Sequence, residues 1–144
     1  MALITRNHAK LTLEGGRAVL TAAERRAEEI RVPMNVAVVD DGGHLLAFGR
    51  MDGAKPASIA IALVKAQAAA LRRAPTGPAM TSDQINLPVA LGLAVAASAH
   101  QTPIRGGIPL LVDGQVVGAI GVSAGTEDQD YDVAQAGAAA LSKT

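Results

Sequence analysis

The chain has 144 residues, a length typical of one domain that buries a sizeable core. Thirteen basic side chains balance thirteen acidic ones, so no net field favours nucleic acid or an anionic membrane as a partner. The chain has no cysteine, which excludes disulfides, thiolate catalysis and zinc–thiolate sites, and neither a signal peptide nor a membrane span is indicated, so we expect a soluble cytoplasmic protein.

The first third of the chain predicts a helix followed by a hairpin. Apolar or small residues recur at helical spacing over residues 7–30, with charged residues mostly on the other face, which predicts an amphipathic helix ending before Pro33. Two β-prone runs, 34–40 and 44–50, flank an Asp-Gly-Gly turn and predict an antiparallel hairpin.

The middle of the chain predicts two helices separated by a break. Residues 56–73 are dense in Ala, Ile and Leu, with Pro56 in the first turn and two arginines at the end. Two prolines break regular structure over residues 74–80. Residues 87–100 predict only a weak helix, in which Pro88 is tolerated near the start.

The last third predicts a second hairpin and a closing helix. Runs 108–112 and 115–123 are joined by an Asp-Gly pair, the strongest short hairpin signal, and Gly118 and Gly121 allow another backbone to approach closely. Thr126 is a credible N-cap for an alanine-rich helix over residues 131–141. Two hairpins with flanking helices indicate an α+β fold with an antiparallel sheet.

Several short motifs follow one another along the chain: RMDGA (50–54), KA followed by PT, GGIPL (106–110), the DG turn, and GVS followed by QD. In this order they resemble the GlcG/HbpS-like family, which includes the haem-degrading domain and PduO C-terminal-like domains. The resemblance spans roughly residues 11–141. It implies a single domain over 1–144 with a profilin-like fold, an antiparallel sheet of about five strands with flanking helices, and assembly into dimers or larger rings. Relatives bind haem or degrade it slowly, and many are companions of catabolic operons.

One position departs from the family pattern. Ala124 stands in GVSAGT where relatives commonly have glycine, and Gly125 follows it. If the loop needs a positive φ at residue 124, we expect its geometry to be shifted by one residue.

The three histidines are the only imidazoles that could ligate a metal. His8 is expected in the first turns of the first helix, where it could reach a pocket, and it is the candidate metal ligand. His44 follows the first hairpin turn and is a weaker candidate for cofactor binding. For His100, capping of the weak helix is favoured over ligation of a metal. No paired histidine motif indicates a dedicated non-haem metal site.

Three charged residues are candidates for binding or catalysis. Arg50 could hold a carboxylate or a haem propionate bidentately, or pair internally with Asp52. Lys65 lies midway along an apolar helix, where partial burial could lower its pKa and let it act as a base or anion contact; the alternative is an ammonium that reaches water. Asp130 is the candidate partner acid or base.

Two loop elements could bind a carboxylate through backbone N–H groups. Thr76, Gly106 and Gly107 offer a hydroxyl and flexible backbone, and pure turn formation is equally consistent with them. No nucleotide-binding loop is present.

Three functions remain open. The first is a homo-oligomer that binds haem or a related tetrapyrrole between subunits, with propionates held by Arg50, Lys65 or an arginine of the 72–73 pair and with His8 or a threonine as a weak axial ligand. The second is a cofactor-independent isomerase, lyase or hydrolase acting on a small organic acid, which the near absence of aromatic residues favours slightly. The third is an accessory oligomeric scaffold.

Overall fold

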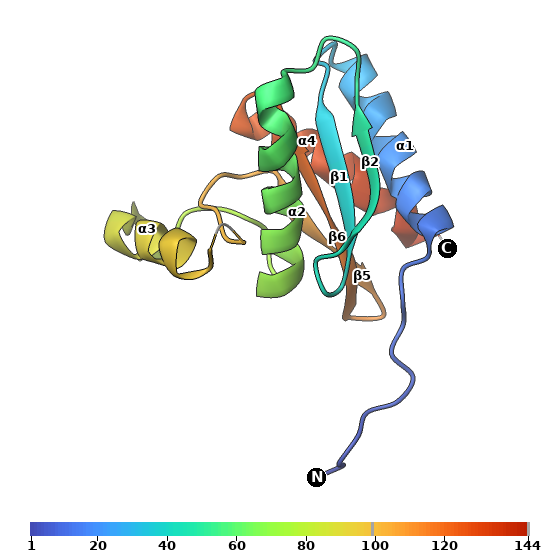
Figure 1. Cartoon of the computed structure of the whole chain (residues 1–144), viewed down its shortest axis with the longest axis vertical. Coiled ribbons are helices and arrows are strands. Elements are labelled where there is room, and N and C mark those ends of the chain that lie inside the picture. Colours follow the sequence, from blue (N-terminus) through green and yellow to red (C-terminus); the bar gives the residue numbers. More distant parts are fainter. Residues whose placement is uncertain (99, 144) are drawn as a thin grey trace.

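A four-stranded antiparallel sheet organises the chain, and it is covered by helices on both faces (Figure 1). The computed structural model describes residues 1–98 and 100–143. The strands lie in the order β2-β1-β6-β5, and their bounds are β1 Asn35–Asp40, β2 Leu45–Arg50, β5 Gly107–Val112 and β6 Gln115–Ser123. The helices α1 (Leu13–Glu29) and α4 (Glu127–Ala138) pack on one face, and α2 (Ile59–Arg72) packs on the other.

Both predicted hairpins are confirmed within one residue at their ends. In the second hairpin, Asp113 and Gly114 have φ of 50° and 74°, the positive values that a tight two-residue turn requires. The two hairpins join through β1 and β6, which run antiparallel with Asn35 opposite Ser123. The sheet therefore arises from two local hairpins and one long-range pairing.

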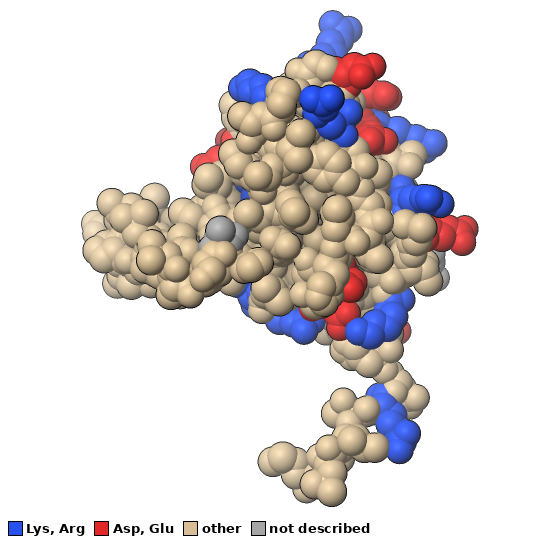
Figure 2. All heavy atoms as spheres, viewed as in Figure 1, with Lys and Arg blue, Asp and Glu red and all other residues tan. Residues whose placement is uncertain are grey.

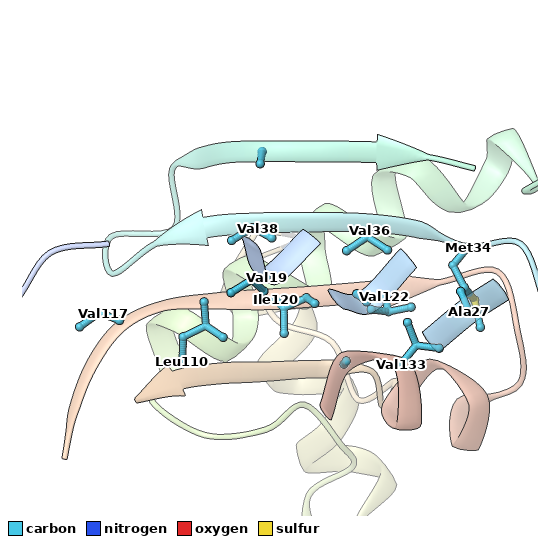
Figure 3. Close-up of a cluster of buried hydrophobic side chains, with 13 residues drawn as sticks. Val19, Ala27, Met34, Val36, Val38, Leu110, Val117, Ile120, Val122 and Val133 are labelled. Atoms are coloured by element: carbon cyan, nitrogen blue, oxygen red, sulfur yellow. The ribbon is translucent and has the colours of Figure 1, made fainter. Parts of the chain in front are cut away.

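The two faces of the sheet bury side chains of different size. Val36 and Val38 of β1 point toward α1 and α4, where they join Ile120 and other large apolar side chains (Figure 3). The opposite face contacts α2 mostly through alanines. A β-carbon at Gly121 would strike the Ala62 carbonyl oxygen, so glycine in β6 allows α2 to approach the sheet closely, as predicted.

The terminal helices differ from their predicted bounds. α1 begins at Leu13 rather than at residue 7, because the Thr12 hydroxyl accepts a hydrogen bond from the Gly15 N–H (3.1 Å) and caps it. His8 therefore precedes the helix instead of lying in it. α4 begins at Glu127 rather than 131, directly after the predicted cap Thr126, which forms a capping box with Gln129. A 3₁₀ segment, Ala139–Lys143, follows it.

The helix predicted over residues 56–73 is confirmed as α2, preceded by the 3₁₀ turn Pro56–Ser58, but the segment after it was predicted only in part. A short ribbon forms from β3 (Met80–Thr81) and β4 (Gln84–Ile85). About five strands were expected in one sheet, whereas the described residues form a sheet of four and this separate pair.

The weak helix expected over residues 87–100 is α3 (Leu87–Ala96), with Pro88 in its first turn as predicted. The Asn86 side chain caps it by accepting from the Val89 N–H (3.2 Å). The helix ends at Ala96, so His100 lies beyond it, but the His100 ring Nδ1 lies 3.2 Å from the carbonyl oxygen of the C-cap residue Ala97, in keeping with the expected capping role. Residue 99 of the predicted range lies outside the described residues. α3 stands away from the sheet (Figure 1).

The loop at residue 124 has not shifted its geometry by one residue. Ala124 itself adopts the positive φ, at 127°, a conformation that favours glycine. Gly125 is needed for a different reason: a β-carbon there would lie 2.7 Å from the Met34 methyl carbon. The chain therefore places alanine at a strained position and glycine at a crowded one.

We expect Ala124→Gly to raise the free energy of unfolding by about 1 kcal/mol, because strain of ~1–3 kcal/mol is relieved and glycine costs ~0.5–1 kcal/mol in unfolded-chain entropy. Urea unfolding followed by far-UV circular dichroism measures the change. Gly125→Ala is the control and should destabilise. A less stable Ala124→Gly variant would show that this φ is not strained.

Candidate functional site

A buried ion pair connects three elements of the fold. The Lys65 ammonium on α2 donates to Asp130 Oδ2 on α4 (2.7 Å) and to the carbonyl oxygen of Val122 on β6 (2.9 Å). The two charged residues are only 1% and 3% exposed. Lys65 is thus fully buried, and its ammonium does not reach water.

Asp130 is held from both sides. Its second carboxylate oxygen accepts a hydrogen bond from the Gly125 N–H (2.9 Å). Burial raises the pKa of Asp130, and the hydrogen bond and charge of Lys65 oppose that rise. Lys65 therefore offsets the desolvation cost of burying the Asp130 carboxylate.

Thr76, Gly106 and Gly107 adjoin the same pair. The Gly107 N–H donates to the Thr76 hydroxyl (2.9 Å), and the Thr76 N–H donates to the Gly107 carbonyl oxygen (2.9 Å). A β-carbon at Gly106, where φ is 122°, would lie 3.0 Å from the Lys65 ammonium. The structure thus brings together five of the residues predicted from the sequence.

This junction is closed on the described surface. Lys65, Asp130 and Thr76 are 1%, 3% and 3% exposed, and the backbone of Gly106 and Gly107 is buried beside them. The Gly107 N–H, which was predicted to contact a ligand, donates instead to the Thr76 hydroxyl within the fold. The contacts show what the junction does in this structure: it joins α2, β6 and α4.

His8 and His44 each lie beside an aspartate at the turn of the first hairpin rather than beside the buried pair. His8 Nε2 lies 3.3 Å from Asp41, and His44 Nδ1 lies 3.2 Å from Asp40. The pKa of Asp41 is lowered, chiefly because its carboxylate accepts a hydrogen bond from Lys10. Burial raises the pKa of Asp40, but hydrogen bonds from this turn outweigh it, so the net shift is downward. The described residues contain no group of three or more side chains arranged to hold a metal.

Arg50 lies in a third place. It borders a polar cleft of about 470 Å³ together with Glu24, Glu28, Met51 and Asp52. Burial and the neighbouring Glu28 raise the pKa of Glu24. Among the described residues no ion pair joins Arg50 to Asp52, and the cleft does not reach Lys65.

An apolar groove between α2 and α3 was not predicted from the sequence. We call it the α2–α3 groove; it measures about 400 Å³, and its lining contains no charged side chain. Its lining residues are Ala60, Ile61, Val64, Ala94, Val95, Gln101, Thr102 and Ile104. The available signal was the weak helix itself, whose ten residues carry no charge.

A small hollow adjoins this groove, and an arginine lines it. Arg72 borders the hollow, which shares Ala94, Gln101 and Thr102 with the groove. One Arg72 nitrogen donates weakly to the Gly77 carbonyl oxygen (3.4 Å). Of the arginines predicted to meet a propionate, Arg72 is thus the one beside an apolar surface.

The sequence and the fold were compared with known proteins. The family model described as haem degrading protein HbpS-like matches residues 11–139. The chain belongs to this HbpS-like family. Protein GlcG of Escherichia coli is 38% identical over 106 residues, covering 74% of this chain and 75% of GlcG.

Two solved structures of this family match the fold over nearly their full length. Klebsiella pneumoniae protein ORFY superposes with a TM-score of 0.85 and 30% identity, covering 100% of this chain and 99% of ORFY. A PduOC:heme complex superposes with a TM-score of 0.80 and 32% identity, covering 92% and 95%. The α+β fold expected from the resemblance is confirmed. None of the described helices has both the length and the apolarity needed to cross a membrane.

We expect Lys65→Met to lower the free energy of unfolding at pH 7 by about 3–5 kcal/mol, since it leaves Asp130 without its counter-ion. Without Lys65 the folded-state pKa of Asp130 rises further above its unfolded value. The folded chain then holds this proton more tightly than the unfolded chain does. The difference from wild type should therefore shrink as the pH falls toward about 4 and widen as it rises.

Lys10→Met is the matched control, because Lys10 lies at a similar distance from Asp41 (2.8 Å) but is solvent-exposed. Urea unfolding of both variants across pH measures the two effects. We expect a much smaller change for Lys10→Met. Equal losses in the two variants would contradict the structural role of the buried pair.

Proposed function

We propose that the chain binds haem or a related tetrapyrrole in the α2–α3 groove. The observation that carries this proposal is an apolar groove without charged residues, in a fold that a relative presents in a PduOC:heme complex. Ligand pockets are mostly apolar, with a few polar groups that set orientation. The α2–α3 groove has this composition, with Gln101 and Thr102 as its polar members.

The residues present fit a tetrapyrrole in two respects. The apolar lining suits the macrocycle, and Arg72 in the adjoining hollow would hold a propionate, because a guanidinium binds carboxylates bidentately. Bound iron would supply the redox and ligand chemistry of haem. The chain's own residues would bind the ring, orient it and exclude water from one side.

The ligand would lie at a boundary between subunits in a homo-oligomer. The α2–α3 groove is open rather than enclosed, so one chain covers only one side of a planar ring. None of His8, His44 and His100 lines it. An imidazole ligand such as His8 would then come from a second copy, while the Thr102 hydroxyl would offer an oxygen ligand within the groove. The cytoplasmic location predicted from the cysteine-free composition remains part of this proposal.

The organic-acid enzyme stays a prediction with less support. It was expected to combine Arg50 with Lys65 and Asp130, and the structure keeps Arg50 in a separate cleft. The buried pair is enclosed by the fold, with Lys65 only 1% and Asp130 only 3% exposed. A catalytic role would require α2 or α4 to move.

The haem proposal predicts saturable binding with a shifted Soret band when haem is added to the ligand-free protein. Ile61→Glu should weaken binding by roughly tenfold or more, because it places a carboxylate in the α2–α3 groove. Leu45→Glu, an exposed apolar residue on β2, is the control and should bind normally. Unchanged binding by Ile61→Glu would exclude this groove as the site. Slow bleaching of the band with a reductant would indicate the degradation that the family name describes.

The axial ligand is tested separately. His8→Ala, His44→Ala and His100→Ala are each titrated with haem and compared by absorbance. If His8 is the ligand, His8→Ala alone should move the Soret band while the other two retain the wild-type spectrum. A wild-type spectrum in all three variants would exclude an imidazole ligand and favour Thr102.

A further inference from the structure

A second groove lies between α1 and the C-terminal end of α4, on the face of the sheet opposite to the α2–α3 groove. We call it the α1–α4 groove; it measures about 530 Å³, and α1 lines it with Glu14, Arg17, Thr21 and Arg25. The other lining residues are all alanines: Ala18, Ala22, Ala136, Ala139 and Ala140. This groove is separate from the proposed haem site, because the sheet stands between the two.

Two arginines of the α1–α4 groove have no charged partner. Charged side chains of both signs lie along the edge of the molecule that α1 forms (Figure 2). Arg26, which does not line the groove, is paired with both Glu29 and Asp132 (2.9 Å each). In the part of the chain that the structure describes, no ion pair involves Arg17 or Arg25. Their guanidinium groups therefore keep all their donors available for an anion.

The spacing of these two arginines sets the length of a ligand that contacts both. They are eight residues apart on α1, so their Cα atoms are separated by about 12 Å along the helix axis. Thr21 lies midway, four residues from each arginine, and all three residues share one side of the helix. A short dicarboxylate does not extend over this distance, whereas a longer chain with an acid at each end does.

The alanines form an apolar floor between the two charged positions. Because alanine ends at its β-carbon, the floor leaves room for a methylene chain, which loses contact with water where it lies in the groove. The volume falls within the range of roughly 300–1,000 Å³ that is usual for small-molecule pockets, which combine an apolar lining with a few polar groups.

One carboxylate in the lining opposes an anionic ligand. Glu14 lies in the first turn of α1, where it complements the positive end of the helix. Two arginines against this single glutamate leave the described lining with a net positive charge. Two cations are too few to hold a polyanion such as a nucleic acid, which is bound through many phosphate contacts.

We propose that the α1–α4 groove binds an elongated organic acid that carries a carboxylate at each end and an apolar chain between them. Arg17 and Arg25 each hold one carboxylate, because a guanidinium donates to both carboxylate oxygens at once. The alanine floor contacts the chain. This binding requires no haem.

The first test varies the length of the acid. Decanedioate and butanedioate are each titrated into the ligand-free full chain and followed by isothermal titration calorimetry. Decanedioate should bind saturably and roughly tenfold or more tightly than butanedioate, because only the longer acid contacts both arginines and buries methylene groups. Equal affinities, or no saturable binding of decanedioate, would overturn the proposal.

The second test asks whether each arginine holds one end of the acid. Arg17→Gln and Arg25→Gln should each weaken decanedioate binding by about fivefold, because each removes one of two exposed ion pairs. Decanoate has one carboxylate, which either arginine can hold, so each single variant should weaken its binding by about twofold at most. The variant that lacks both arginines should lose most of the binding of either acid.

Arg31→Gln is the matched control, because Arg31 is exposed, lies outside the α1–α4 groove and carries the same charge. An equal loss of decanedioate binding in this control would reduce the effect to net charge and overturn the site. Far-UV circular dichroism checks that the variants remain folded, which is expected because Arg17 and Arg25 are exposed.

Backbone amide chemical shifts locate the bound acid. On titration with decanedioate, the amide signals of Ala18, Ala22 and Ala136 should move, since these residues line the α1–α4 groove. Movement confined to residues of the α2–α3 groove would contradict the proposal and assign the acid to the other face of the sheet.

Discussion

The buried pair between Lys65 and Asp130 is the interaction on which the arrangement of the other elements depends. An ammonium removed from water is costly unless a charge and hydrogen-bond acceptors replace the lost solvent. Here both come from distant parts of the chain, one from α4 and one from the backbone of β6. The helices on opposite faces of the sheet are therefore coupled through a single side chain.

That coupling explains several residues that carry no charge. Lys65 can lie this deep because glycines stand at the first residue of β5 and directly before it: a β-carbon at Gly107 would strike the Lys65 carbonyl oxygen, and one at Gly106 would crowd its ammonium. Thr76 then ties the loop after α2 to Gly107 through two hydrogen bonds. In this structure the GGIPL motif and the threonine of the PT motif serve the packing around the buried lysine.

The unequal faces of the sheet connect packing with function. Large aliphatic side chains fill the layer under α1 and α4, whereas alanines and Gly121 let α2 lie close to the opposite face. With few aromatic residues in the chain, the second core is thin and α2 has no covering layer. Ile59 and Ile61 on its outer side are left as apolar surface. The proposed ligand and the proposed subunit boundary both use this surface.

Local chemistry in the sequence determined most of the fold. Turn residues specified both hairpins, hydrophobic periodicity specified α1, and helix-favouring composition with end signals specified α2 and α4, because these signals act over a few neighbouring residues. The cap at Thr126 was predicted, whereas the cap at Thr12 was not, so α1 begins later than the apolar pattern indicated. The positive φ at Ala124 came from its position between β6 and α4, not from its side chain.

The residues of the candidate site could be predicted from the sequence, but their arrangement could not. The sequence singled out Lys65, Asp130, Thr76 and the two glycines, and the tertiary structure placed them in one junction. Only the tertiary structure decided that this junction is closed, that Arg50 and His8 lie elsewhere, and that α2 and α3 enclose a groove. The buried pair joins residues that are 65 positions apart in the chain, and no local pattern encodes which distant residues meet.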